Sequence, residues 1–199
     1  MKKLLQICAV GLLVVTAAFT PAIGQTLYPE LTQSFKDLKK VKIDYDRQDV
    51  LTGVQQMGIM AKQQKKPVLI ELIGNDGFSG PIAKAVLKAA LANNGISDVQ
   101  VVFVGTAASD KVSQALLKMG FKMSGREAKY NDQSGSVTLE STATNPQGIH
   151  VLLSDDAASL LSAPDKFAVK LHYPADVKAE LIAAEMVFVA NKIKENWKY

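Results

Sequence analysis

The chain has 199 residues, of which 48% are hydrophobic, 21% are charged and 7% are aromatic. This composition excludes a disordered chain and is typical of a globular protein with one main domain. The net charge of +4 does not predict nucleic-acid binding, because the lysines are interleaved with Asp and Glu and form no run of five or six.

Residues 1–24 have the features of a signal peptide. Lys2 and Lys3 precede an apolar run from Leu4 to Phe19, and small residues follow at the usual cleavage positions. The run is shorter than the roughly 20 residues that a membrane-spanning helix needs. We expect cleavage after Gly24 and export to the bacterial periplasm or the medium, without a stable membrane span afterwards. An uncleaved membrane anchor is the alternative.

Removal of this segment leaves a mature chain without cysteine. Cys8 is the only cysteine and lies inside the apolar run, so a lipoprotein signal is not expected. The loss of Lys2 and Lys3 changes the net charge from +4 to +2. An exported domain without disulfide bonds must be held together by its apolar core.

Two helices are predicted before the first strand. Apolar residues recur at helical spacing in residues 28–40 and again in residues 49–64. We assign residues 25–66 to an N-terminal helical extension and residues 67–199 to the main domain. Val68–Ile73 then predicts a strand buried on both faces, although Glu71 is unusual inside such an apolar run.

Helices and strands alternate in the next segment. A helix is predicted from Ser79, with Pro81 in its first turn, to Asn93. Val99–Val104 is the second strand, and Ser109 marks the start of a helix that ends at Gly120. This βαβα order predicts an α/β fold with a parallel sheet.

The following residues, 126–145, depart from that pattern and predict a small hairpin-like insertion. Residues 130–136 have the composition of a turn, and residues 137–142 alternate like an exposed strand.

The βα alternation resumes after the insertion. Ile149–Leu153 is the third strand, and a short helix follows at Asp155–Leu161, capped by Asp155 and Asp156. Phe167–Leu171 is the fourth strand. The last helix, residues 176–197, is apolar enough to pack across the sheet.

The order of these parts resembles the low-molecular-weight protein tyrosine phosphatase family and the bacterial arsenate reductases that share its fold. The similar segments are PVLIELIGNDGFSGPIAKAVLKAAL, VVFVGTAASDKVSQALLKMGFKMSG, GIHVLLSDDAA, VKLHYPAD and AEMVFVANKIK, with YPELTQSFKDL resembling an N-terminal helix of some bacterial members. The resemblance implies a three-layer fold with a central four-stranded parallel sheet, to which the two N-terminal helices and the insertion are added.

The same resemblance implies that the catalytic groups are missing. The family's loop has a nucleophilic cysteine, then five residues, then an anion-binding arginine. In this chain the cysteine position is Leu72 and the arginine position is Phe78. The acid position falls on Ala175, and Asp176 is one residue late. The additional cysteines of the reductases fall near Leu153 and near Leu160 or Leu161. A leucine cannot replace a thiolate, and a phenylalanine cannot bind an oxyanion in a bidentate manner.

The loop itself is therefore the candidate ligand site. It is made of Leu72, Ile73, Gly74, Asn75, Asp76, Gly77, Phe78 and Ser79. Backbone amides at a helix N-terminus bind anions, but Asp76 places a negative charge there or caps the helix itself. We expect the loop to be plugged or to prefer a neutral or apolar ligand.

Three functions remain open at this point. The first is a catalytically inactive binding or interaction module, with an unknown protein or a small molecule as partner and without cofactor. The second is a hydrolase that uses Ser79, Asp76 or Glu71 with His150 or His172 as base. The third is a subunit of an envelope complex whose contact face is formed by the helices at 28–40 and 49–64. A metal site at the histidines is not expected, because Asp155 and Asp156 lack ligand spacing.

Overall fold

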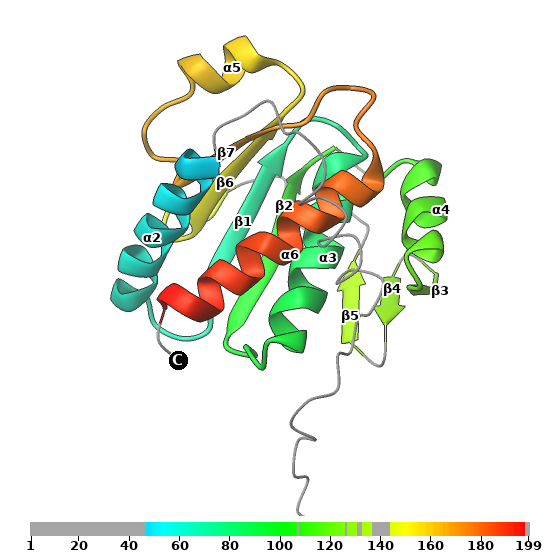
Figure 1. Cartoon of the computed structure of the whole chain (residues 1–199), viewed down its shortest axis with the longest axis horizontal. Coiled ribbons are helices and arrows are strands. Elements are labelled where there is room, and N and C mark those ends of the chain that lie inside the picture. Colours follow the sequence, from blue (N-terminus) through cyan, green and yellow to red (C-terminus); the bar gives the residue numbers. More distant parts are fainter. Residues whose placement is uncertain (1–46, 107, 126, 131–132, 137–143, 198–199) are drawn as a thin grey trace, which may run out of the picture.

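The computed structural model describes residues 47–197, except 107, 126, 131–132 and 137–143 (Figure 1). The predicted signal peptide, the predicted helix at 28–40 and the predicted strand at 137–142 lie outside these residues. The predicted helix at 49–64 is present as α2, Arg47–Gln63. Among the described residues, no helix is both long enough and apolar enough to cross a membrane.

The centre of the fold is a parallel sheet of four strands in the order β2-β1-β6-β7, which confirms the predicted parallel α/β core. The strands are β1 (Val68–Gly74), β2 (Val99–Gly105), β6 (Ile149–Ser154) and β7 (Val169–His172). The fourth strand begins two residues later than predicted and extends to His172. β1 and β6 are the inner strands, so their polar side chains need partners from within the protein.

Three helices lie side by side over one face of this sheet (Figure 1). α3 (Ser79–Asn93) and α6 (Ala179–Asn196) pack closely against each other, and α2 packs against α6 and β7. Val54 and Met57 of α2 are fully buried in the same core as Ile70 and Leu72 of β1. The described part of the N-terminal extension is therefore packed into the core of the α/β domain.

Two glycines allow the first strand, the second strand and α3 to approach closely. A Cβ atom on Gly105 would lie 1.8 Å from the carbonyl oxygen of Gly74, and a Cβ on Gly80 would lie 2.1 Å from the Phe103 ring. Both positions therefore require a residue without a side chain, and they fix the start of α3 against β2.

The remaining elements lie around the sheet. α4 (Asp110–Lys118) follows β2, with Ser109 as its N-cap residue, and α5 (Ala157–Ser162) follows β6. Between α4 and β6 lies a three-stranded antiparallel sheet of β3 (Lys122–Ser124), β4 (Glu127–Tyr130) and β5 (Gln133–Ser136). The predicted turn over residues 130–136 was too long, because Tyr130 ends β4 and Gln133–Ser136 pairs with β4 as a strand, whereas the antiparallel β4–β5 pair agrees with the predicted hairpin-like insertion. Polar, small residues there resemble a turn in sequence, although strand pairing uses only their backbone.

Candidate functional site

The loop between β1 and α3 lies at the carboxyl ends of the parallel strands, where ligands most often bind in α/β folds. The chain passes from β1 through α3 to β2 on one side, whereas β6 and β7 lie on the other side of β1. In open α/β sheets such a reversal of strand order marks the usual place of ligand binding, which here is the carboxyl ends of β1 and β6. The predicted loop, residues 72–79, is at this position.

Asp76 occupies the hydrogen-bond donors of this loop. Its Oδ1 accepts the backbone N–H of Phe78 at 2.9 Å and also the backbone N–H of Ser79, and its Oδ2 accepts the Ser79 hydroxyl. Ser79 is the first residue of α3, so these amides belong to the positive end of a 15-residue helix. The carboxylate of Asp76 thus lies where an anionic ligand would bind, and it acts as the cap of α3 that the sequence suggested.

The same arrangement recurs at a second helix start. Asp156 Oδ1 accepts the N–H of Ala158 at 3.0 Å, and its Oδ2 accepts the N–H and the hydroxyl of Ser159 at 3.2 and 2.6 Å. The Ser159 hydroxyl, with help from the Ala158 amide, holds the pKa of Asp156 below its usual value. Asp76 and Asp156 therefore share one local hydrogen-bond pattern, Asp-x-x-Ser. Asp156 is itself the N-cap residue of α5, whereas Asp76 lies two residues before Phe78, the N-cap residue of α3.

The residues at the family's nucleophile and arginine positions face the core. Leu72 lies inside β1, two residues before its end, and is 1% exposed. Phe78 is half-buried and packs against the core. Neither side chain carries a polar atom, so neither can serve as the nucleophile or the anion-binding group that the resemblance would place at these two positions.

The backbone of the loop is bound to the segment that follows β2. The carbonyl oxygen of Asn75 accepts the Thr106 hydroxyl at 2.5 Å, and the carbonyl oxygen of Gly77 accepts the N–H of Ser109 at 2.8 Å. Asn75 itself is exposed. Ile73 and Gly74 belong to β1 and pair with Val104 and Gly105. These bonds hold the loop against β2 and the segment that follows it.

Ala175 and Asp176, at and beside the family's acid position, are exposed after β7. A buried acid is found on α6: Glu185 Oε2 accepts the hydroxyl of Tyr173, which is 2% exposed, at 2.7 Å. Burial raises the pKa of Glu185 to about 8. Burial also raises the pKa of Tyr173, and the nearby Asp76 carboxylate raises it further. This pair was not predicted from the sequence, in which the one indication is a glutamate within the apolar run of the last helix.

The structure does not bring the histidines and Ser79 together. His150 lies opposite Glu71 in the β1–β6 register, three residues and about 10 Å before the end of β1. Its Nε2 lies 3.0 Å from Glu71 Oε2 and 2.9 Å from the Asn145 carbonyl oxygen. Both neighbours are acceptors, so Nε2 carries a proton and cannot act as a base toward Ser79.

The other histidine is at the end of β7. His172 Nε2 lies 3.1 Å from the carbonyl oxygen of Asp155. This contact joins the ring to the backbone just before α5. Within the part of the chain that the structure describes, no group of three or more His, Cys, Asp or Glu side chains is arranged to hold a metal ion. The histidines thus have separate local roles.

The odd Glu71 is explained by the fold. Its carboxylate accepts the Asn145 N–H at 2.8 and 3.0 Å and faces His150, and it is 2% exposed. This pairing could not be predicted from the sequence, because residues 71, 145 and 150 meet only through the β1–β6 register.

No protein-family model matches the chain, and no curated protein matches it significantly.

Proposed function

We propose that this chain is an exported, catalytically inactive protein of the low-molecular-weight phosphatase and arsenate reductase type that acts as a binding or interaction module. The observation that carries the proposal is the Asp76 carboxylate, which accepts hydrogen bonds from the Phe78 amide and the Ser79 amide and hydroxyl. These donors are the ones an oxyanion would need, and a second negative charge at the same place is repelled.

The proposal is also supported by what surrounds the loop. Phe78 is half-buried and contributes apolar surface where the family has a guanidinium. Leu72, where the family has a thiolate, is buried in the core and out of reach of a ligand. The ligand proposed for residues 72–79 is neutral or apolar, because the loop has no positive side chain for an anion and its one carboxylate, Asp76, is already bound to the Phe78 and Ser79 donors. The four parallel strands and the helices α3 and α6 are consistent with the fold type that the resemblance implies.

A turnover assay tests the proposal directly. The purified chain is incubated with an aryl phosphate, and separately with arsenate and a thiol reductant, beside a Phe78→Ala variant. We expect both proteins to give the rate of the buffer alone, since position 72 carries leucine in place of the family's cysteine nucleophile and Ser79 has no histidine base beside it. A rate for the natural chain that exceeds the rate for the variant overturns the proposal.

A further inference from the structure

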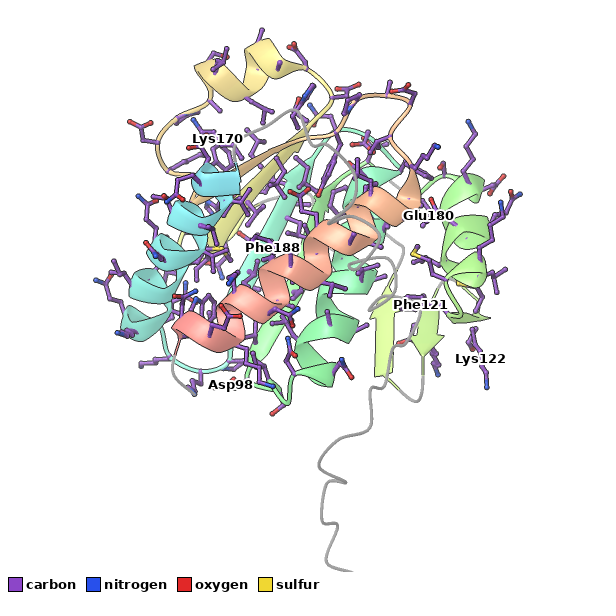
Figure 2. The ribbon with its side chains drawn as sticks, viewed as in Figure 1. Asp98, Phe121, Lys122, Lys170, Glu180 and Phe188 are labelled. Atoms are coloured by element: carbon purple, nitrogen blue, oxygen red, sulfur yellow. The ribbon has the colours of Figure 1, made fainter. Side chains whose placement is uncertain are left out.

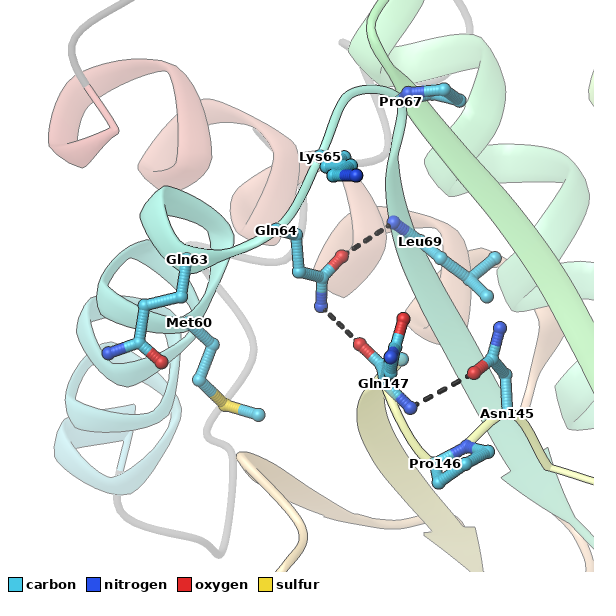
Figure 3. A pocket seen from close by; sticks show the side chains of 10 residues that line it. Met60, Gln63, Gln64, Lys65, Pro67, Leu69, Asn145, Pro146 and Gln147 are labelled. Atoms are coloured by element: carbon cyan, nitrogen blue, oxygen red, sulfur yellow. Dashed lines mark hydrogen bonds between the residues drawn. The ribbon is translucent and has the colours of Figure 1, made fainter.

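A cavity of about 600 Å³ lies at the opposite end of β1 from the 72–79 loop. This volume is within the range of small-molecule sites. Its walls are the C-terminal end of α2, the first residues of β1 and the segment before β6 (Figure 3). The lining residues are Met60, Gln63, Gln64, Lys65, Pro67, Leu69, Asn145, Pro146, Gln147 and Gly148.

The wall formed by residues 145–148 contacts two buried ionisable side chains, Glu71 and His150. The Asn145 N–H and carbonyl oxygen bind Glu71 and His150 as described above, and a Cβ on Gly148 would lie 2.7 Å from Glu71 Oε2. Burying a carboxylate and an imidazole in a sheet is costly compared with apolar residues. Such departures from an apolar core are most often found where they shape a functional site.

The opposite wall is joined to this segment by one carboxamide. β1 pairs with β6 only from Ile70 onward, so the Leu69 N–H and the Gln147 carbonyl have no strand partner between them. The Gln64 side chain fills this gap: its Oε1 accepts the Leu69 N–H at 3.1 Å, and its Nε2 donates to the Gln147 carbonyl at 2.6 Å (Figure 3). The Gln147 N–H in turn donates to Asn145 Oδ1 at 2.9 Å. The cavity is therefore organised before any ligand enters.

The lining defines what such a ligand carries. Four carboxamide side chains line the cavity, and Lys65 is the single charged residue among the lining residues. Gln64 and Asn145 already make bonds within the protein, but a carboxamide oxygen can accept a second hydrogen bond and its NH2 group can donate two. Met60 and Leu69, both partly buried, add apolar surface. We propose that this cavity binds a small carboxylate that also carries an amide and an apolar substituent. The carboxylate pairs with Lys65, the amide with the carboxamides, and the substituent with Met60 and Leu69. This site is independent of the proposed inactivity of the 72–79 loop.

N-acetyl-leucine contains these three groups and is the probe. It is titrated into the ¹⁵N-labelled chain while amide chemical shifts are followed by NMR. We expect saturable shifts at Leu69, Gln147 and Gly148, with a dissociation constant on the order of 1 mM, since the probe is small. N-acetyl-leucinamide, which lacks the carboxylate, should bind about three- to fivefold more weakly.

Two exposed lysines provide a matched pair of variants. Lys65→Gln should weaken N-acetyl-leucine binding about three- to fivefold, whereas Lys62→Gln, in the last turn of α2 and outside the cavity lining, should leave it unchanged. Both side chains are exposed, so both variants should fold. The proposal is overturned if no saturable shift occurs at these amides, if the shifts map elsewhere, or if the two variants lose affinity equally.

Discussion

Asp76 supplies the start of α3 with the hydrogen bonds that an anionic ligand would otherwise supply. The sequence contained this information, because Asp-x-x-Ser is a local pattern and capping depends on residues two and three positions away. Glu71 and Glu185 differ in this respect. Their partners, His150 and Tyr173, belong to other parts of the fold, so only the structure reveals that each buried acid has a hydrogen-bond partner. Figure 2 shows the side chains that fill the space between the helices and the sheet.

The raised pKa of Glu185 predicts a pH-dependent stability. The folded chain keeps the proton up to about pH 8, whereas the unfolded chain releases it near the ordinary glutamate pKa of 4.5. The unfolded state therefore binds fewer protons between these values, and the free energy of unfolding should fall as pH rises through this window, by at most about 1.4 kcal/mol per pH unit. Urea denaturation between pH 5 and pH 8 measures it.

The control for this prediction is Glu185→Gln, whose carboxamide oxygen can still accept the Tyr173 hydroxyl. Lys84 is buried in α3, which packs against α6, and it is present in both the natural chain and the variant. Its charge therefore does not account for a difference between the two proteins. The free energy of unfolding of the natural chain should fall relative to that of the variant as pH rises, because only the natural chain has a proton to lose on unfolding. A difference that is constant across the window would show that Glu185 does not bind the proton in the folded state.

Glu71 should contribute to stability through its hydrogen bonds. Glu71→Ala leaves the Asn145 N–H and the His150 Nε2–H without this acceptor, and we expect a loss of about 1–3 kcal/mol. Glu71→Gln retains one acceptor oxygen and should lose less. Urea denaturation at pH 7 compares the two variants, and equal stability of the natural chain and Glu71→Ala would refute the role assigned to this carboxylate.

At the level of elements, the start of α3 depends on the absence of a side chain at position 80. Gly80→Ala would bring a Cβ to 2.1 Å from the Phe103 ring, so the helix or the ring must move. We expect a loss of about 1–3 kcal/mol in the free energy of unfolding, opposite to the usual gain from alanine inside a helix. Thermal or urea denaturation checks this value.

A second substitution separates crowding from other causes. Phe103→Leu removes the ring atoms nearest to Gly80, so Gly80→Ala on that background should be close to neutral. If Gly80→Ala costs the same free energy with and without the Phe103 ring, the close approach of α3 and β2 is not the reason for the glycine.

The elements with strong periodicity were predicted closely, and those without it were not. α3 has its predicted bounds, and the four parallel strands are present because each is a run of mostly apolar residues between turn residues. β5 was missed because Gln133–Ser136 has no apolar alternation. The cavity was also missed, since it forms between α2, β1 and the segment before β6, which no local pattern connects.

At the scale of the whole molecule, the prediction of export concerns residues outside those described. Expression of the full sequence in a bacterium should give a mature protein in the periplasm or the medium whose first residue is Gln25. N-terminal sequencing identifies that residue, and a variant in which Lys2 and Lys3 are replaced by Glu should accumulate uncleaved. Recovery of an intact N-terminus from the cell interior for the natural sequence would contradict the prediction.

The central claim for the molecule is that Asp76 closes the end of α3 to anions. The most direct measurement is an NMR titration with inorganic phosphate that follows the amide signals of Phe78 and Ser79. Three proteins are compared: the natural chain, Asp76→Ala, and Asp156→Ala, which removes the equivalent cap from α5. We predict no saturable shift up to about 10 mM phosphate in the natural chain or in Asp156→Ala, and weak saturable shifts in Asp76→Ala. Saturable phosphate binding at these two amides in the natural chain would contradict the claim.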